Sequence, residues 1–202
     1  MRYKILDQKG LNFLTITVVD WIDLFTRKAI CEIVTSNLAY SRNKKGLKIF
    51  GYVIMSSHIH LIVRAAKEQD LSAIIRDFKS YTAKQIIEFL KEKESKESRK
   101  EWLLSHFRNA AIIDGKNRNY KVWQNGNRPI ELYTPQVIRQ KLNYIHRNPV
   151  LGGIVSLPEH YLHSSASNYR SGHLSASQKN NKLEIDLLEG IWNDEGFIFM
   201  GR

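Results

Sequence analysis

Hydrophobic and polar residues alternate along the chain in patterns that separate strands from helices. Residues 11–19 are rich in β-branched and aromatic side chains, which is typical of a buried strand. Residues 22–42 instead carry apolar side chains at helical spacing. The next two stretches, 47–55 and 58–65, are both strand-like, and the turn Ser56-Ser57 joins them. This half of the chain therefore predicts a strand, a helix and a β-hairpin.

Two further helices are predicted in the second half. Residues 71–94 have the pattern of a long amphipathic helix, which begins after Asp70 as N-cap. Residues 135–147 form the other helix, with Thr134 as N-cap and a proline at the first helical position. We expect Pro149 to end this helix, because a residue before proline avoids the helical region.

The order of the elements predicts the fold class. A short strand at 128–133 completes the order β-α-β-β-α-(β)-α. That order suits an α+β, ferredoxin-like (RRM-like) sandwich, with a central antiparallel sheet, helices on one face and the other face free for a ligand. We expect one domain over residues 1–175 and an extension, packed or arm-like, over 176–202. The stretch 182–188 alternates and is a candidate late strand.

Net charge narrows the class of partner. Lys and Arg number 31 against 20 Asp and Glu, which gives +11 and a pI near 9.7. A protein this basic attracts polyanions, with nucleic acid as the first candidate and a membrane surface as the alternative. One cysteine, Cys31, excludes an intrachain disulfide, and we see neither a signal peptide nor a membrane span. We therefore expect a cytoplasmic protein.

The triplet His58-Ile59-His60 is the sharpest chemical feature. Alternate side chains of a strand share a face, so both imidazoles point the same way. Two neighbouring imidazoles can bind one divalent metal. Two ordinary strand histidines, one at the surface and one half-buried, are the alternative.

Tyr144 and Asn148 are the second feature, because positions i and i+4 share one face of a helix. A phenol can attack phosphorus if the phosphate is polarised by a metal. The Asn148 oxygen would complete an N,N,O set that suits Mg²⁺ or Mn²⁺. Packing on the sheet is the alternative for Tyr144, and Tyr81 is a competing nucleophile on a helix where packing also accounts for it.

Basic and aromatic residues also suggest contacts with DNA. Stacking side chains beside cations suit a single-stranded nucleic acid channel, although each cluster alone also fits solvated surface and the tryptophan also fits a core. The candidate DNA-binding residues are Arg42, Lys44, Lys45, Lys121, Trp123, Arg128, Arg139 and Arg147.

Four segments of the sequence resemble a known family. The stretch 50–63, with its two histidines, resembles the HUH motif region of single-tyrosine transposases. The stretches 122–124 and 142–150 are similar to the second signature of REP-associated tyrosine transposases, within the IS200-like superfamily. The stretch 164–169 is similar to a segment that often follows in that family.

The resemblance implies a function. It implies a ferredoxin-like HUH endonuclease fold, with His58, His60 and Asn148 binding Mg²⁺ or Mn²⁺ at the scissile phosphate. It implies that Tyr144 attacks, leaving a 5′-phosphotyrosine and a free 3′-hydroxyl, so that strands are cut and rejoined in DNA transposition. The implied partner is single-stranded DNA with a REP-like or element-end hairpin, bound by a monomer or a homodimer.

Several features leave other functions open. Ser56-Ser57 replaces the Pro-Asn or Pro-Glu usual before the first histidine of the family. A catalytically inactive hairpin-binding regulator is the main alternative, although DNA binding alone requires none of the four site residues. A histidine-triad hydrolase would need a third histidine where the chain has Ile62. A zinc hydrolase would need a third nitrogen or carboxylate ligand at helix or strand spacing.

Overall fold

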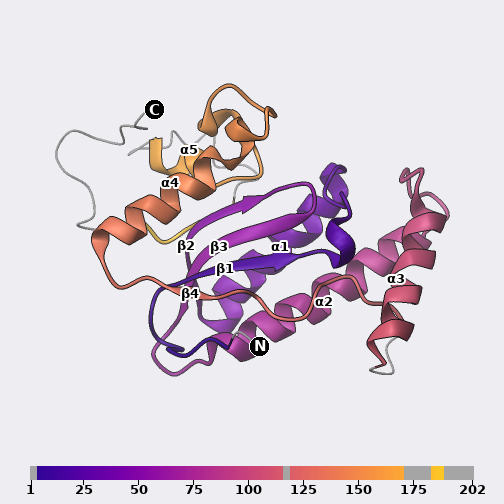
Figure 1. The fold of residues 1–202 in the computed structure, drawn as a ribbon, viewed down its shortest axis with the longest axis horizontal. Helices are drawn as coiled ribbons and strands as arrows, with labels where there is room; N and C mark the ends of the chain where they lie inside the picture. The colour runs from indigo at the N-terminus through magenta and orange to yellow at the C-terminus, as the bar shows by residue number, and fades with distance from the viewer. Residues whose placement is uncertain (1–3, 116–118, 171–182, 189–202) are drawn as a thin grey trace.

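The computed structural model describes residues 4–115, 119–170 and 183–188, arranged as a four-stranded sheet with flanking helices (Figure 1). The four expected strands lie within two residues of their predicted bounds, whereas the first expected helix begins six residues later than predicted. The described chain also contains the helix α3. The elements are β1 Asn12–Thr17, η1 Val19–Trp21, α1 Lys28–Lys45, β2 Leu47–Ile54, β3 His58–Ala65, α2 Leu71–Lys91, α3 Lys100–Asp114, β4 Ile130–Glu131, α4 Pro135–Leu151, η2 Pro158–His160 and α5 Ala166–Arg170.

The sheet has the ferredoxin-like strand order. Its order is β2-β3-β1-β4, and all three pairings are antiparallel. The β-α-β-β-α-β path with β1 and β3 at the centre is the ferredoxin-like arrangement, so the predicted fold class is confirmed. In the register of the central pair, Thr15 lies opposite His60 and Thr17 opposite His58. Side chains of directly opposed residues share a face of the sheet, so these four are neighbours.

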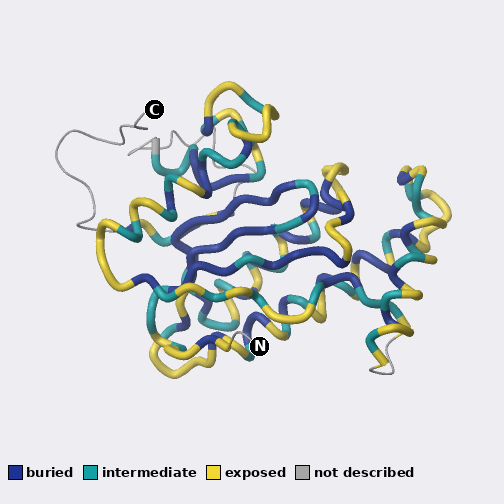
Figure 2. The backbone as a smooth tube through the Cα atoms, in the orientation of Figure 1, coloured by how far each residue is buried: buried dark blue, intermediate teal, exposed yellow. Residues whose placement is uncertain are grey.

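Helices pack on both faces of the sheet, which differs from the prediction of one open face. The larger core lies between the sheet and the helices α1 and α2. A smaller core lies on the other face, where α4 packs against β2 and β3. Figure 2 shows the central strands buried along most of their length between these layers. The smaller core consists of Phe13, Phe50, Val53, Met55, Ile62, Leu132, Leu142, Ile145 and Leu188.

Both expected helix caps are present, but α4 is longer than predicted. Asp70 accepts a hydrogen bond from the Ala73 N–H at 2.8 Å, and Thr134 caps α4 in the same way. The helix then continues through Pro149 to Leu151. A proline in a helix loses one backbone hydrogen bond. Pro149 is buried in the last turn, where packing of the helix face outweighs that loss.

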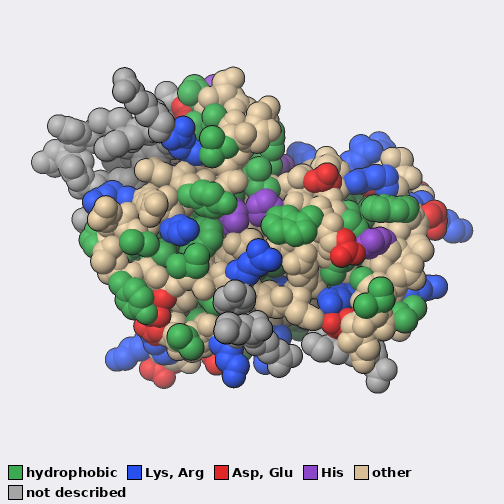
Figure 3. All heavy atoms as spheres, in the orientation of Figure 1, with side chains coloured by type: hydrophobic (Ala, Val, Ile, Leu, Met, Phe, Trp, Pro, Cys, Tyr) green, Lys and Arg blue, Asp and Glu red, His purple; other side chains and the backbone are tan. Residues whose placement is uncertain are grey.

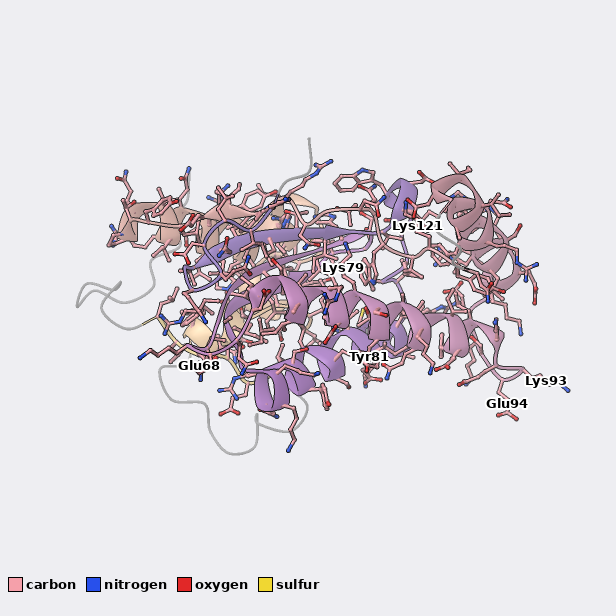
Figure 4. All side chains as sticks on the ribbon, turned by 90° about the horizontal axis from the view of Figure 1, so that it is seen from below. Glu68, Lys79, Tyr81, Lys93, Glu94 and Lys121 are labelled. Atoms are coloured by element: carbon pink, nitrogen blue, oxygen red, sulfur yellow. The ribbon has the colours of Figure 1, made fainter. Side chains whose placement is uncertain are left out.

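The charged run 91–101 contains a buried carboxylate that anchors it to the rest of the protein. Glu97 has a side chain only 1% exposed and accepts hydrogen bonds from the Arg99 side chain and backbone. Arg99 also donates to the Asp23 carbonyl and the Thr26 hydroxyl. The run therefore fixes the start of α3 against the loop before α1, while Lys93 and Glu94 project from its turn (Figure 4).

Residues 183–188 form no strand, although they were a candidate for one; position 182 lies outside the described residues. Their backbone still follows the sheet edge, because the Asp186 N–H donates to the Ile49 carbonyl at 2.7 Å. Leu183, Ile185 and Leu188 are buried. No helix in the described part of the chain has both the length and the apolar composition of a membrane span.

Candidate active site

His58 and His60 point together from β3 toward the face that carries α4. Their ring centroids are 4.7 Å apart, while Ile59 between them is fully buried in the opposite core. The alternation of the strand produces this arrangement. Figure 3 shows histidine side chains side by side near the middle of this face, with hydrophobic side chains on both sides.

Hydroxyl groups orient both imidazoles. Thr15 Oγ1 is 3.0 Å from His60 Nδ1, and Ser57 Oγ is 3.2 Å from His58 Nδ1. When each Nδ1 carries the proton and donates to its hydroxyl, each Nε2 presents a lone pair. His60 Nε2 is buried and has no hydrogen-bond partner among the described residues. A partner on one ring nitrogen that leaves the other free is the usual setting of a metal-binding histidine.

Burial keeps both imidazoles neutral. It lowers the pKa of His58 from its ordinary value, and it lowers the pKa of His60 to about 3, with contributions from the charges of His58 and Lys141. A neutral imidazole is the form that binds a metal. The pair therefore offers two nitrogen donors at pH 7 without a proton to displace.

Tyr144 lies beside this pair in the same chain. Its ring centroid is 5.3 Å from that of His60, and both rings contact Phe13. The tyrosine is 43% exposed, so its phenol is open to a ligand. Lys141, one turn earlier on α4, holds its ammonium 5.6 Å from the Tyr144 ring centroid and 4.9 Å from that of Phe13.

Asn148 shares the face of α4 with Tyr144 but bonds elsewhere. Its side-chain amide donates to the Tyr144 carbonyl at 3.0 Å, and no described contact joins it to either imidazole. Among the described residues no three His, Cys, Asp or Glu side chains gather as a metal site. The two imidazoles nevertheless fit a divalent cation, because His60 Nε2 is buried and has no described partner. Such a cation would take its other ligands from Asn148, water or substrate.

Three features of the sequence fix α4 against the sheet. A Cβ at Gly51 would lie 2.7 Å from Leu142 Cδ1, so the glycine lets the helix approach β2 closely. His146, fully buried, has its Nε2 2.8 Å from the Ser165 hydroxyl. That hydroxyl also accepts from the Tyr52 N–H on β2. Ser165, within the stretch 164–169 that resembles the family segment, therefore connects α4 to the edge strand β2 through hydrogen bonds.

Trp21 sits at the other end of the histidine pair, on a strained backbone. Asp20 and Trp21 have φ of 53° and 56°, and a left-handed conformation costs a non-glycine residue about 1–2 kcal/mol. The Asp20 carboxylate is 2.7 Å from His106 Nε2 on α3. The Trp21 ring centroid is 5.4 Å from that of His58, and the residue is 47% exposed.

The residues predicted to bind DNA are dispersed. Trp123 belongs to the core: it is 5% exposed, stacks on Phe25 and donates to Thr82, so its indole has no open face for a base. Lys121 pairs with Asp114 at 2.7 Å and is 15% exposed.

The remaining predicted cations fall into two groups. Arg42, Lys44 and Lys45 end α1 on the opposite face of the sheet, where Arg42 pairs with acidic residues of the 183–188 stretch. Arg139 and Arg147 belong to α4. Arg128 is exposed. The carbonyl of its neighbour Asn127 accepts a hydrogen bond from the Thr15 N–H, and Thr15 lies opposite His60 in the sheet. Arg128 is therefore near the strands that carry the histidines.

A groove of about 730 Å³ lies away from these chemical groups, between α2 and residues 119–127. Lys79 spans its floor, donating to the Gln124 and Gly126 carbonyls. Figure 4 shows Lys79 and Lys121 on this side and Tyr81 leaving α2 in another direction. Tyr81, the competing nucleophile, is 54% exposed and has no described histidine beside it.

Comparison with known proteins relates part of the sequence to a family and the fold to a solved structure. Residues 20–114 match the family model described as Transposase IS200 like, a stretch that includes both histidines and ends before Tyr144. No curated protein matches the sequence. The fold resembles that of a REP-associated tyrosine transposase bound to a REP hairpin, at 14% identity and a TM-score of 0.58, over 91% of this chain and 93% of that one.

A putative transposase from Deinococcus radiodurans R1 is more distant, at 12% identity and a TM-score of 0.39 over 72% of this chain and 98% of that one. The family model covers the strand with the histidines, and the similarity of fold to the REP-associated transposase extends over the rest of the site. Residues 20–114 therefore resemble the IS200-like transposase family, and the fold of the chain resembles that of a REP-associated tyrosine transposase.

Proposed function

We propose that the chain cuts single-stranded DNA and transfers the cut strand, with Tyr144 as the nucleophile. The observation that carries the proposal is the contact between the exposed Tyr144 ring and His60. The buried Nε2 of that histidine has no partner among the described residues. One chain thus holds a phenol beside a candidate cation site, as cleavage through a phosphotyrosine requires.

The proposed chemical step exchanges one phosphodiester bond for another. The Tyr144 phenolic oxygen loses its proton to water and forms a bond to phosphorus, while the bond from phosphorus to the 3′ oxygen breaks. The 3′ oxygen takes up a proton, and the 5′ phosphate stays on the tyrosine. Because one phosphodiester replaces another, a second 3′-hydroxyl can reverse the step and join the strands without a nucleotide cofactor.

His58, His60 and, after rotation of its side chain, Asn148 would hold Mg²⁺ or Mn²⁺. When bound, such a cation polarises the phosphate as a Lewis acid. Thr15 and Ser57 keep the two imidazoles in place, and Phe13 packs against both His60 and Tyr144. Lys141 and Arg128 would neutralise the charge of the flanking phosphates.

The proposed substrate is single-stranded DNA that carries a hairpin. The structure of similar fold is a complex with a REP hairpin, and the net charge of +11 favours a nucleic acid. The residues that would read the hairpin remain a prediction, for which Arg139 and Arg147 on the tyrosine helix are the first candidates.

The test uses labelled hairpin oligonucleotides with randomised single-stranded flanks, incubated with the protein and Mn²⁺. We expect a protein–DNA adduct that resists SDS, that disappears with EDTA and that is absent from Tyr144→Phe, although this variant still binds the DNA. Tyr81→Phe is the matched control, because it removes another exposed phenol, on α2, that has no described contact with either histidine. An undiminished adduct in Tyr144→Phe would exclude Tyr144 as the nucleophile.

A further inference from the structure

The aromatic rings of the site form a row. Trp21 contacts His58, His58 contacts His60, and His60 contacts Tyr144, with ring centroids 5.4, 4.7 and 5.3 Å apart. Of the two histidines, Trp21 contacts only His58 and Tyr144 contacts only His60 among the described ring contacts. The indole and the phenol therefore occupy opposite ends of the histidine pair.

Several interactions hold Trp21 in this unusual place. Its N–H donates to the Val18 carbonyl at 3.1 Å, and the Val19 N–H donates to the Val122 carbonyl at 2.9 Å. The Asp20 carboxylate bonds to His106 of α3. Two successive left-handed residues persist only where the surroundings fix them, and such strain gathers at ligand-binding positions. The result is a rigid, half-exposed indole beside a candidate metal ligand, where core packing does not account for it.

The geometry of phosphoryl transfer indicates which part of the DNA would lie beside this indole. The attacking and leaving oxygens lie roughly in line on opposite sides of the phosphorus. With the phosphate at the histidines and Tyr144 attacking from the His60 end, the 3′ oxygen departs toward the His58 end. The nucleoside that carries this oxygen then lies over Trp21, and an exposed indole is the side chain on which an unpaired base stacks.

We propose that Trp21 is the stacking platform for the unpaired base on the 5′ side of the cut, the nucleotide that carries the leaving 3′ oxygen. This inference rests on the proposed function. Stacking there orients the leaving group and also holds the free 3′-hydroxyl in place for the joining step. It accepts any base, because every base presents an aromatic face.

The first test measures binding and needs no cleavage. The probes are a 15-mer of thymidylate and a 15-mer of abasic sugar phosphate, compared by fluorescence anisotropy at one ionic strength. We expect Trp21→Ala to weaken thymidylate binding by roughly 5- to 100-fold and to leave abasic binding unchanged, while Trp21→Phe keeps most of the affinity. The control is Trp102→Ala, which removes a similarly exposed indole that lies at a tilt beside His106.

Equal losses for both probes, no loss at all, or the same loss in Trp102→Ala would overturn the stacking role.

The second test places one abasic site on either side of the cut that the wild-type adduct reveals. We expect the site on the 5′ side to slow adduct formation in the wild type but not further in Trp21→Ala. The site on the 3′ side should slow both proteins equally, and the opposite pattern would overturn the assignment. Absence of any wild-type adduct refutes the proposed cleavage, while the binding test still reports on Trp21.

Discussion

At the residue scale, the Thr15 hydroxyl forms the described hydrogen bond that orients the His60 ring. Thr15→Val keeps the shape of the side chain but removes the bond to His60 Nδ1, so the ring and its tautomer are no longer fixed. Loss of such a partner weakens metal binding about 10- to 100-fold. We expect the Mn²⁺ concentration for half-maximal adduct to rise by that factor, with the adduct restored at saturating Mn²⁺.

The matched control for this substitution is Thr17→Val. Thr17 lies on the same face of β1, opposite His58, and has no described side-chain hydrogen bond. Its substitution should leave the Mn²⁺ requirement unchanged. An unchanged requirement in Thr15→Val would mean that the hydroxyl does not orient the ligand.

The sequence predicts the candidate site residues at this scale better than the residues that support them. His58, His60 and Tyr144 were candidates because spacing within one element marks them. Thr15 and Lys141 approach the histidines only through strand register and helix packing, which no pattern within one segment contains. Trp123 illustrates the reverse error, because a tryptophan among basic residues resembles a DNA contact until its burial is known.

At the element scale, the approach of α4 to the sheet positions Tyr144, the proposed nucleophile. Gly51→Ala places a Cβ 2.7 Å from Leu142 Cδ1, and Leu142 is fully buried with little room to move. We expect a loss of about 1–3 kcal/mol in the free energy of unfolding and a lower adduct yield, because α4 is pushed from His60. Urea unfolding and the adduct assay measure these two effects.

A shorter partner side chain provides the control for this prediction. Leu142→Val removes the carbon atom that clashes, so the double variant Gly51→Ala/Leu142→Val should recover more adduct than Gly51→Ala alone. Wild-type adduct yield in Gly51→Ala would show that close packing at Gly51 does not set the position of Tyr144.

The junction between α2 and α3 gives a pH-dependent prediction. Hydrogen bonds from Arg99, aided by the charge of Arg27, hold the pKa of Glu97 below its ordinary value of 4.5. When folding lowers a carboxyl pKa, the protein gains stability. This gain is complete above the pKa of the unfolded state and is lost as the pH falls through the pKa of the folded state. Glu97→Gln should therefore be less stable than the wild type at pH 7, by about 1–3 kcal/mol. The difference between the two unfolding midpoints should shrink as the pH falls below 4.5 and vanish below the lowered pKa of folded Glu97. A difference that does not shrink as the pH falls would contradict this account.

The order of the elements was predictable because apolar spacing marks the strands and helices, and Asp70 and Thr134 mark the starts of α2 and α4.

The errors have physical causes. Pro149 stays inside α4 because tertiary packing outweighs one lost hydrogen bond, and β4 is short because the preceding segment joins β1 through isolated contacts. The second layer of helix was missed because patterns within a segment do not say which face of a sheet it covers.

At the scale of the whole molecule, one chain brings Tyr144 and both histidines together, so we predict that a single chain forms the complete site. A mixture of Tyr144→Phe and His60→Ala chains should then form no adduct, because neither chain has both groups. Wild-type protein at the same total concentration is the positive control. Adduct from the mixture would show that the tyrosine of one subunit serves the histidines of another.

The most direct test of the central claim is to locate the DNA on the protein. Trypsin cuts after Lys141 and Arg147, so Tyr144 is the only tyrosine of the peptide 142–147, whereas Tyr81 lies in the peptide 80–84. After nuclease treatment of the Mn²⁺-dependent adduct, mass spectrometry should find the nucleotide 5′-phosphate on peptide 142–147. A nucleotide found instead on any other peptide would contradict the assignment of Tyr144 as the nucleophile beside the histidine pair.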